Sequence, residues 1–103
     1  VLYATDTGWY GEPTWASLAG AALDLAVLEC GKGISDNPYD GHLTLDDCVR
    51  FRARLLDSGA LKPGGRVLLT HICHTGMLLH DELVERAVPL GMEVAWDGLE
   101  LRL

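Results

Sequence analysis

Apolar runs of strand length alternate along this chain with amphipathic stretches of helix length. Residues 1–5 (VLYAT) favour a short buried strand, and residues 13–23 (PTWASLAGAAL) favour a helix, because proline is tolerated in the first helical turn. Residues 23–30 (LDLAVLEC) form a nearly continuous apolar run, which is typical of a strand buried on both faces. Residues 31–41 are rich in glycine, aspartate and proline and predict a loop.

The next segment repeats the pattern of a helix followed by a strand. Thr44 is a good N-cap and Asp47 is placed as the acid of a capping box. The apolar spacing then predicts a helix over residues 45–58. Residues 62–65 (KPGG) predict a turn, and residues 66–70 (RVLLT) predict a third buried strand.

The last third of the chain predicts one more helix and a hairpin. A short helix is expected over residues 78–90, ended by Pro89. The final twelve residues suggest two strands around Asp97-Gly98, a pair that favours tight hairpin turns. The order strand, helix, strand, helix, strand, helix, hairpin indicates an α/β fold, α+β in some schemes, with at least partly parallel pairing.

Charge and composition exclude some classes of function. The 103 residues fit one small domain or part of a larger one, and 49% of them are hydrophobic. The net charge of −7 and the pI near 4.8 argue against a general nucleic-acid binder. The negative charge does not exclude a small anionic substrate, because a bound metal ion makes the local electrostatic potential positive. No apolar run approaches the ~20 residues of a membrane span.

The three cysteines, Cys30, Cys48 and Cys73, are an odd number without framework spacing. They favour free thiols in a reducing compartment, so we expect a cytoplasmic protein. The chain opens directly on an apolar strand, which predicts further sequence upstream.

Polar residues follow the predicted strands, and in open α/β sheets this edge binds ligands. Asp6 follows the first strand and suits either a metal-bridging carboxylate or an ordinary turn. Glu29 ends the second strand, where it can orient a histidine or accept hydrogen bonds from the next loop. Three aromatic residues lie near Asp6 in the sequence: Trp9, Tyr10 and Trp15. They suit either the wall of a pocket or packing in the core.

The histidines are the other candidates. His42 precedes a helix cap, where it suits proton donation to a leaving group or a plain surface position. His71 follows the third strand and is the strongest candidate ligand, with His74 three residues on. Cys73 between them gives "HICH", but a structural zinc site needs four ligands, so this thiol is expected to pack. His80 is expected to face solvent on the last helix.

Taken in order, these motifs resemble a known family. The series "YATDTG", "LEC", "GHLTLDD", "VLLTHICH" and "VAWDGLEL" is similar to the C-terminal half of metallo-β-lactamase-fold hydrolases. Within them it most resembles PhnP-like phosphodiesterases, which are relatives of ribonuclease Z. The resemblance covers residues 1–103 and implies half of an αββα sandwich.

The resemblance also implies roles for single residues. Asp6 matches the carboxylate that bridges two metal ions, and His71 matches the last histidine ligand. His42 matches a histidine that contacts the scissile phosphate and assists the leaving group. His74 matches a recurring histidine that supports the ligands, and Cys73 stands where a serine is usual.

The family's cofactors and missing parts lead to further expectations. The family uses two divalent ions, zinc or manganese, to activate water on a small phosphodiester, cyclic esters included. Its main metal motif, His-x-His-x-Asp-His, is absent from this chain. We therefore expect an N-terminal half, as a second chain or missing segment, to complete the site and cover one face of the sheet. Alone this chain should be inactive, and the complete protein is expected to form a homodimer.

Two alternatives stay open at this point. One keeps the fold but cleaves tRNA precursors like ribonuclease Z, which the few lysines and arginines disfavour. The other is a degenerate metallo-β-lactamase-like domain that binds or assembles without catalysis. The presence of Asp6, His42 and His71 together argues against the second alternative.

Overall fold

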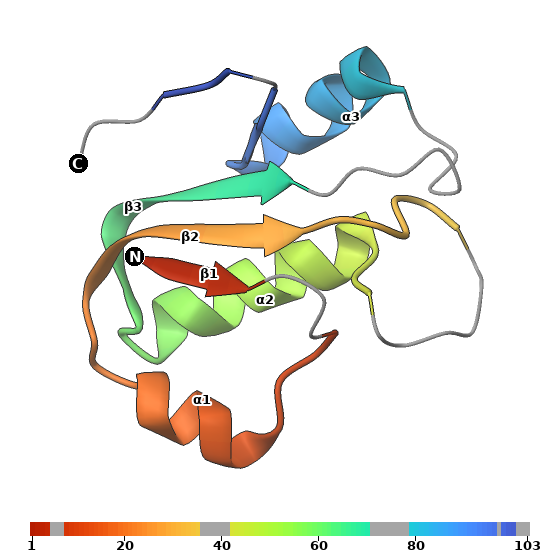
Figure 1. Cartoon of the computed structure of the whole chain (residues 1–103). Coiled ribbons are helices and arrows are strands. Elements are labelled where there is room, and N and C mark those ends of the chain that lie inside the picture. The colour runs from red at the N-terminus through yellow and green to blue at the C-terminus, as the bar shows by residue number, and fades with distance from the viewer. Residues whose placement is uncertain (5–7, 36–41, 71–78, 97, 101–103) are drawn as a thin grey trace.

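A parallel four-stranded sheet organises the chain (Figure 1). The structure, a computed structural model, describes residues 1–4, 8–35, 42–70, 79–96 and 98–100. The strands lie in the order β1-β2-β3-β4, and each neighbouring pair is parallel. The elements are β1 (Leu2–Ala4), α1 (Glu12–Leu18), β2 (Leu23–Glu29), α2 (Leu45–Asp57), β3 (Leu61–Thr70), α3 (His80–Ala87), the 3₁₀ helix η2 (Val88–Leu90) and β4 (Glu93–Val94). The predicted α/β class and parallel pairing are confirmed.

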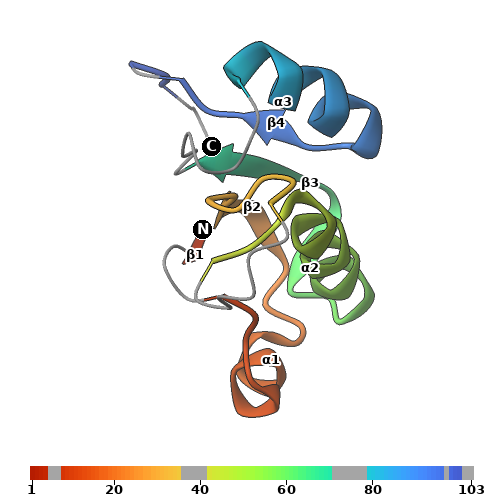
Figure 2. The ribbon, with the colours of Figure 1, turned by 90° about the vertical axis from the view of Figure 1, so that its right-hand side faces the viewer.

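The main core lies on one face of the sheet. Ala26 and Leu28 of β2 point to this face, since alternate strand residues face opposite sides. All three helices contribute to the same core, with Trp15 from α1, Phe51 from α2 and Leu83 from α3. In Figure 2 the helices lie below, to the right of and above the strands, and no helix lies to their left.

The opposite face of the sheet carries a much smaller apolar cluster. Leu25, Val27 and Leu68 form it, with Ala95 and Leu99 packed against them, and no described helix takes part. Tyr3 pairs with Val27 in the ladder, yet 68% of its surface is exposed. This helix-free face is called the outer face below.

The ends of the helices show where residues close in the sequence are enough to predict the structure and where they are not. The capping box of α2 forms as predicted: the Asp47 N–H donates to Thr44 Oγ1 and the Thr44 N–H to Asp47 Oδ2, both at 3.0 Å. By contrast, α1 ends at Leu18, so its predicted extension to residue 23 was wrong. Gly20 and Ala22 adopt positive φ angles of 78° and 51°, which a right-handed helix does not allow.

The turn predicted at residues 62–65 was wrong, because β3 runs through it from Leu61 to Thr70. These residues form a bulge: Leu23 pairs with Leu61, but Leu25, two residues on, pairs with Arg66. Glycine is required here, since a Cβ on Gly65 would lie 2.6 Å from Leu61 Cδ1.

The C-terminal hairpin also differs from the prediction. β4 pairs parallel to β3 after the α3 crossover, so its strand is used in the sheet rather than in a hairpin. Residues 98–100 are not in a strand, and the Leu99 N–H donates to the Trp96 carbonyl at 3.1 Å in a turn. Asp97 and residues 101–103 lie outside the described residues. α3 ends at Ala87, shortly before Pro89, as expected.

Candidate functional site

The carboxyl ends of β1, β2 and β3 meet at one edge of the sheet, because the three strands are parallel. Glu29 ends β2 at this edge, opposite Thr70 at the end of β3. In the sequence, Asp6 follows β1 by two residues and His71 follows Thr70 directly. The side chains of Asp6, His71, Cys73 and His74 lie outside the described residues, so their predicted roles stay predictions.

Glu29 is a buried carboxylate with a defined set of partners. Its side chain has no exposed surface. The Gly31 N–H donates to Oε2 at 2.7 Å, and the Leu43 N–H donates to Oε1 at 2.6 Å. The Nδ1 atom of His42 lies 3.5 Å from Oε2. Glu29 therefore accepts hydrogen bonds from the following segments, one of the two roles considered for it, and the second role, orienting a histidine, stays a prediction.

Two loop segments bring His42 to Glu29. The Lys32 N–H donates to the Leu43 carbonyl at 3.1 Å, and the Leu45 N–H donates to the Gly33 carbonyl at 2.8 Å. The chain before α2 therefore runs beside the chain after β2, although about ten residues separate them in the sequence.

Gly31 allows the close packing of this pair. A Cβ on Gly31 would lie 3.1 Å from Glu29 Oε2 and 3.3 Å from His42 Cγ. Both distances are tighter than nine in ten real Cβ contacts, so a larger residue would push the carboxylate and the imidazole apart.

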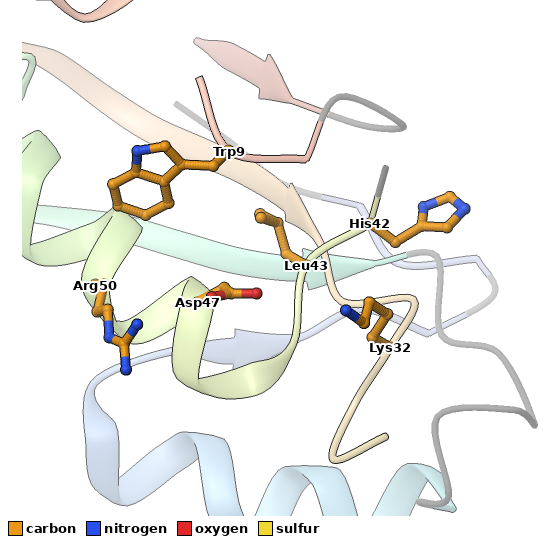
Figure 3. A pocket seen from close by; sticks show the side chains of 6 residues that line it. All are labelled: Trp9, Lys32, His42, Leu43, Asp47 and Arg50. Atoms are coloured by element: carbon orange, nitrogen blue, oxygen red, sulfur yellow. The ribbon is translucent and has the colours of Figure 1, made fainter. Parts of the chain in front are cut away.

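The imidazole of His42 is accessible while its Nδ1 edge faces the carboxylate. Its side chain is 31% exposed, and in Figure 3 the ring points away from Trp9. The Nδ1 edge of the ring is buried against the carboxylate, 3.5 Å from Oε2, and the opposite edge carries Nε2. Nε2 is then the nitrogen that can act on a ligand.

A hollow of about 360 Å³ adjoins His42 (Figure 3). Its lining comes from the segment before α1, the loop after β2 and the start of α2: Trp9, Lys32, His42, Leu43, Asp47 and Arg50. Trp9 both packs and lines this space, with its ring centroid 5.3 Å from that of Trp15 and 43% of its surface exposed. Trp15 itself belongs to the core.

The cysteines behind Glu29 are structural. Cys30 and Cys48 are free thiols, as predicted, and both are buried; Cys48 Sγ donates to the Glu29 carbonyl at 3.4 Å. A hydrogen bond to Cys30, together with burial, raises the pKa of the Cys48 thiol well above its usual range. Cys48 therefore stays protonated and unreactive at neutral pH.

Within the described ranges, no three histidine, cysteine, aspartate or glutamate side chains gather as metal ligands. Glu29 binds an N–H group with each of its oxygens, which suits support of His42 rather than metal ligation. His80 is exposed at the start of α3, as expected.

Comparisons with known proteins add no relative: the sequence matches no family model, no curated protein and no solved structure. Among the described residues, no helix has the length and apolar character to cross a membrane. The resemblance to metallo-β-lactamase-fold hydrolases thus rests on the sequence motifs.

Proposed function

We propose that this chain is the C-terminal half of a metal-dependent phosphodiesterase that acts on small, including cyclic, phosphodiesters. The observation that carries the proposal is the pair of Glu29 and His42 at the carboxyl edge of the sheet. An accessible histidine lies there beside the strand ends that lead to Asp6 and His71. Ligand sites in open parallel sheets lie at this edge.

The metal ligands of this chain fit zinc or manganese in kind but not in number. Asp6 offers a carboxylate and His71 an imidazole, which are ligands of both metals. Two ions need roughly four to six ligands each, so the N-terminal half has to supply the others. When bound, the two ions lower the pKa of a water molecule and neutralise phosphodiester oxygens.

Within this chain, His42 is proposed to protonate the leaving group. As the P–O bond breaks, the proton on Nε2 passes to the departing oxygen. Glu29 lies against the Nδ1 edge, with Oε2 3.5 Å from Nδ1, so that Nε2 is the nitrogen on the opposite edge of the ring. The two N–H bonds to Glu29 keep its carboxylate in place during the reaction.

The outer face is the proposed contact surface for the N-terminal half. It bears Leu25, Val27 and Leu68, which no described helix covers, and the exposed ring of Tyr3. In a four-layer αββα sandwich this face packs against a second sheet, which would bury these apolar side chains. The half-sandwich architecture is therefore part of the proposal.

The test is hydrolysis of aryl methyl phosphates by the complete purified protein with manganese or zinc. Removal of the metal should abolish activity, and His42→Ala should lower kcat about 10²-fold or more with a phenol leaving group. The loss should be smaller with 4-nitrophenol, which leaves readily without a proton. Metal content should not change.

His80→Ala is the matched control, because this histidine is exposed at the start of α3 and does not line the hollow beside His42. It should retain full activity. Hydrolysis by metal-free protein would refute the metal chemistry. Equal activity of the His42→Ala and His80→Ala proteins would refute the role of His42.

A further inference from the structure

Two cations, Lys32 and Arg50, line the hollow beside His42. Lys32 and Arg50 form no ion pair with any residue that the structure describes. Three other cations of the described chain pair with carboxylates, Arg54 with Glu12, Lys62 with Asp24 and Arg66 with Glu93, whereas Arg52 and Arg86 do not. In a chain with net charge −7, two cations without such partners at one hollow favour an anionic ligand.

An aromatic wall stands in the same hollow. Trp9 packs edge-on against Phe51, with ring centroids 5.5 Å apart, and also against Trp15. These contacts hold the indole in place while 43% of the residue remains exposed. A fixed and partly exposed indole is a stacking surface for a planar ring.

The remaining lining supplies an apolar base and an acceptor. Leu43 is almost fully buried and lies between Trp9 and Lys32 in Figure 3. Asp47 uses Oδ2 to cap α2 through the Thr44 N–H, which leaves Oδ1 to accept a hydrogen bond. Its charge repels an anion, so the anionic group belongs near Lys32 or Arg50, and hydroxyl or ring N–H groups belong near Asp47.

We propose that this hollow binds an aromatic ring joined to an anionic group. Its volume of about 360 Å³ suits a small molecule. His42 lines the hollow and lies at the carboxyl edge of the sheet, and it is the residue proposed to protonate the leaving group. The group bound in the hollow is therefore the leaving part of the substrate. That placement in the reaction rests on the proposed function, whereas the binding does not.

Titration calorimetry on the purified metal-free protein tests the binding with three probes. AMP carries both a ring and a phosphate, adenosine lacks the phosphate, and ribose 5-phosphate lacks the ring. AMP should bind at least tenfold more tightly than either of the others. Equal affinity for AMP and ribose 5-phosphate, or no binding of AMP, would overturn the proposal.

Variants of the lining residues then show which residues bind the phosphate and which bind the ring. Lys32→Gln and Arg50→Gln should each weaken AMP binding several-fold, and about tenfold or more together, without changing the affinity for adenosine. Trp9→Leu should remove the advantage of AMP over ribose 5-phosphate. Lys62→Gln, outside the hollow, should bind AMP like the unchanged protein.

Two outcomes separate this proposal from the proposed function. Unchanged AMP affinity in the Lys32→Gln/Arg50→Gln protein refutes binding in the hollow. Because Arg50 is exposed and Lys32 is half-buried, this variant should fold and decide the question even where Trp9→Leu unfolds. AMP binding without any metal-dependent hydrolysis supports the hollow and refutes the phosphodiesterase. Metal-dependent hydrolysis without selective AMP binding supports the phosphodiesterase and refutes binding in the hollow.

Discussion

Replacing Glu29 by glutamine tests whether the buried carboxylate holds the site together. Glutamine has nearly the same shape, but only one of its two terminal atoms accepts hydrogen bonds. One of the two donors, the Gly31 N–H or the Leu43 N–H, would then face an NH₂ group. Hydrogen bonds to charged groups contribute about 1.5–3 kcal/mol, and an unsatisfied buried donor costs about 1–3 kcal/mol. We expect Glu29→Gln to lower the free energy of unfolding by about 2–4 kcal/mol.

Urea unfolding followed by circular dichroism measures this loss. Glu93→Gln is the matched control, since Glu93 is an exposed glutamate whose ion pair with Arg66 lies at the surface. Exposed ion pairs contribute little, so the control should unfold close to the unchanged protein. If Glu29→Gln and Glu93→Gln unfold at the same urea concentration, the carboxylate does not hold the two loop segments and the reasoning fails.

Three further predictions concern other parts of the fold. Thr44→Ala removes the cap of α2 and should cost about 1 kcal/mol of unfolding free energy in urea; an unchanged midpoint would contradict the cap's contribution. Arg66 lowers the pKa of the Glu93 carboxyl, so this pair stabilises the fold above the usual glutamate pKa and the gain is lost as pH falls through the lowered value. Arg66→Gln should raise the pKa of Glu93 in an NMR titration, and no rise would refute the pairing. Iodoacetamide at pH 8 should label Cys30 and Cys48 only after unfolding, as mapped by mass spectrometry, and fast native labelling would contradict their burial.

Elements with strong local signals could be predicted from the sequence. The predictions of the capping box at Thr44 and of the buried strand β2 were correct, because residues close in the sequence determine the hydrogen bonds of the cap and the burial of the strand. The errors all involve distant contacts. The end of α1 is set where the Gly20 N–H donates to the Ser58 carbonyl, and residues 62–65 stay in β3 because the strand pairs on both sides of the bulge.

Part of the candidate site could be predicted from the sequence, and part could not. His42 and Glu29 were candidates because one precedes a helix cap and the other ends an apolar strand, although each position also suited an ordinary structural role. The hollow could not be predicted, because Lys32 and Arg50 come together only after the loop behind β2 pairs with the segment before α2. No periodicity in the sequence reports that pairing.

The all-parallel ladder has a consequence for how the chain folds. Each pair of neighbouring strands is separated in the sequence by a crossover that contains a helix, so no two strands can join as a hairpin. The β2–α2–β3 unit, residues 23–70, is the shortest continuous segment with the central strand pair and the helix that covers it. Closing this long loop precedes the gain from strand pairing, so folding should be slow for a chain of this size. The Glu29 and His42 pair lies within that same unit, so its two residues come together only when the unit closes.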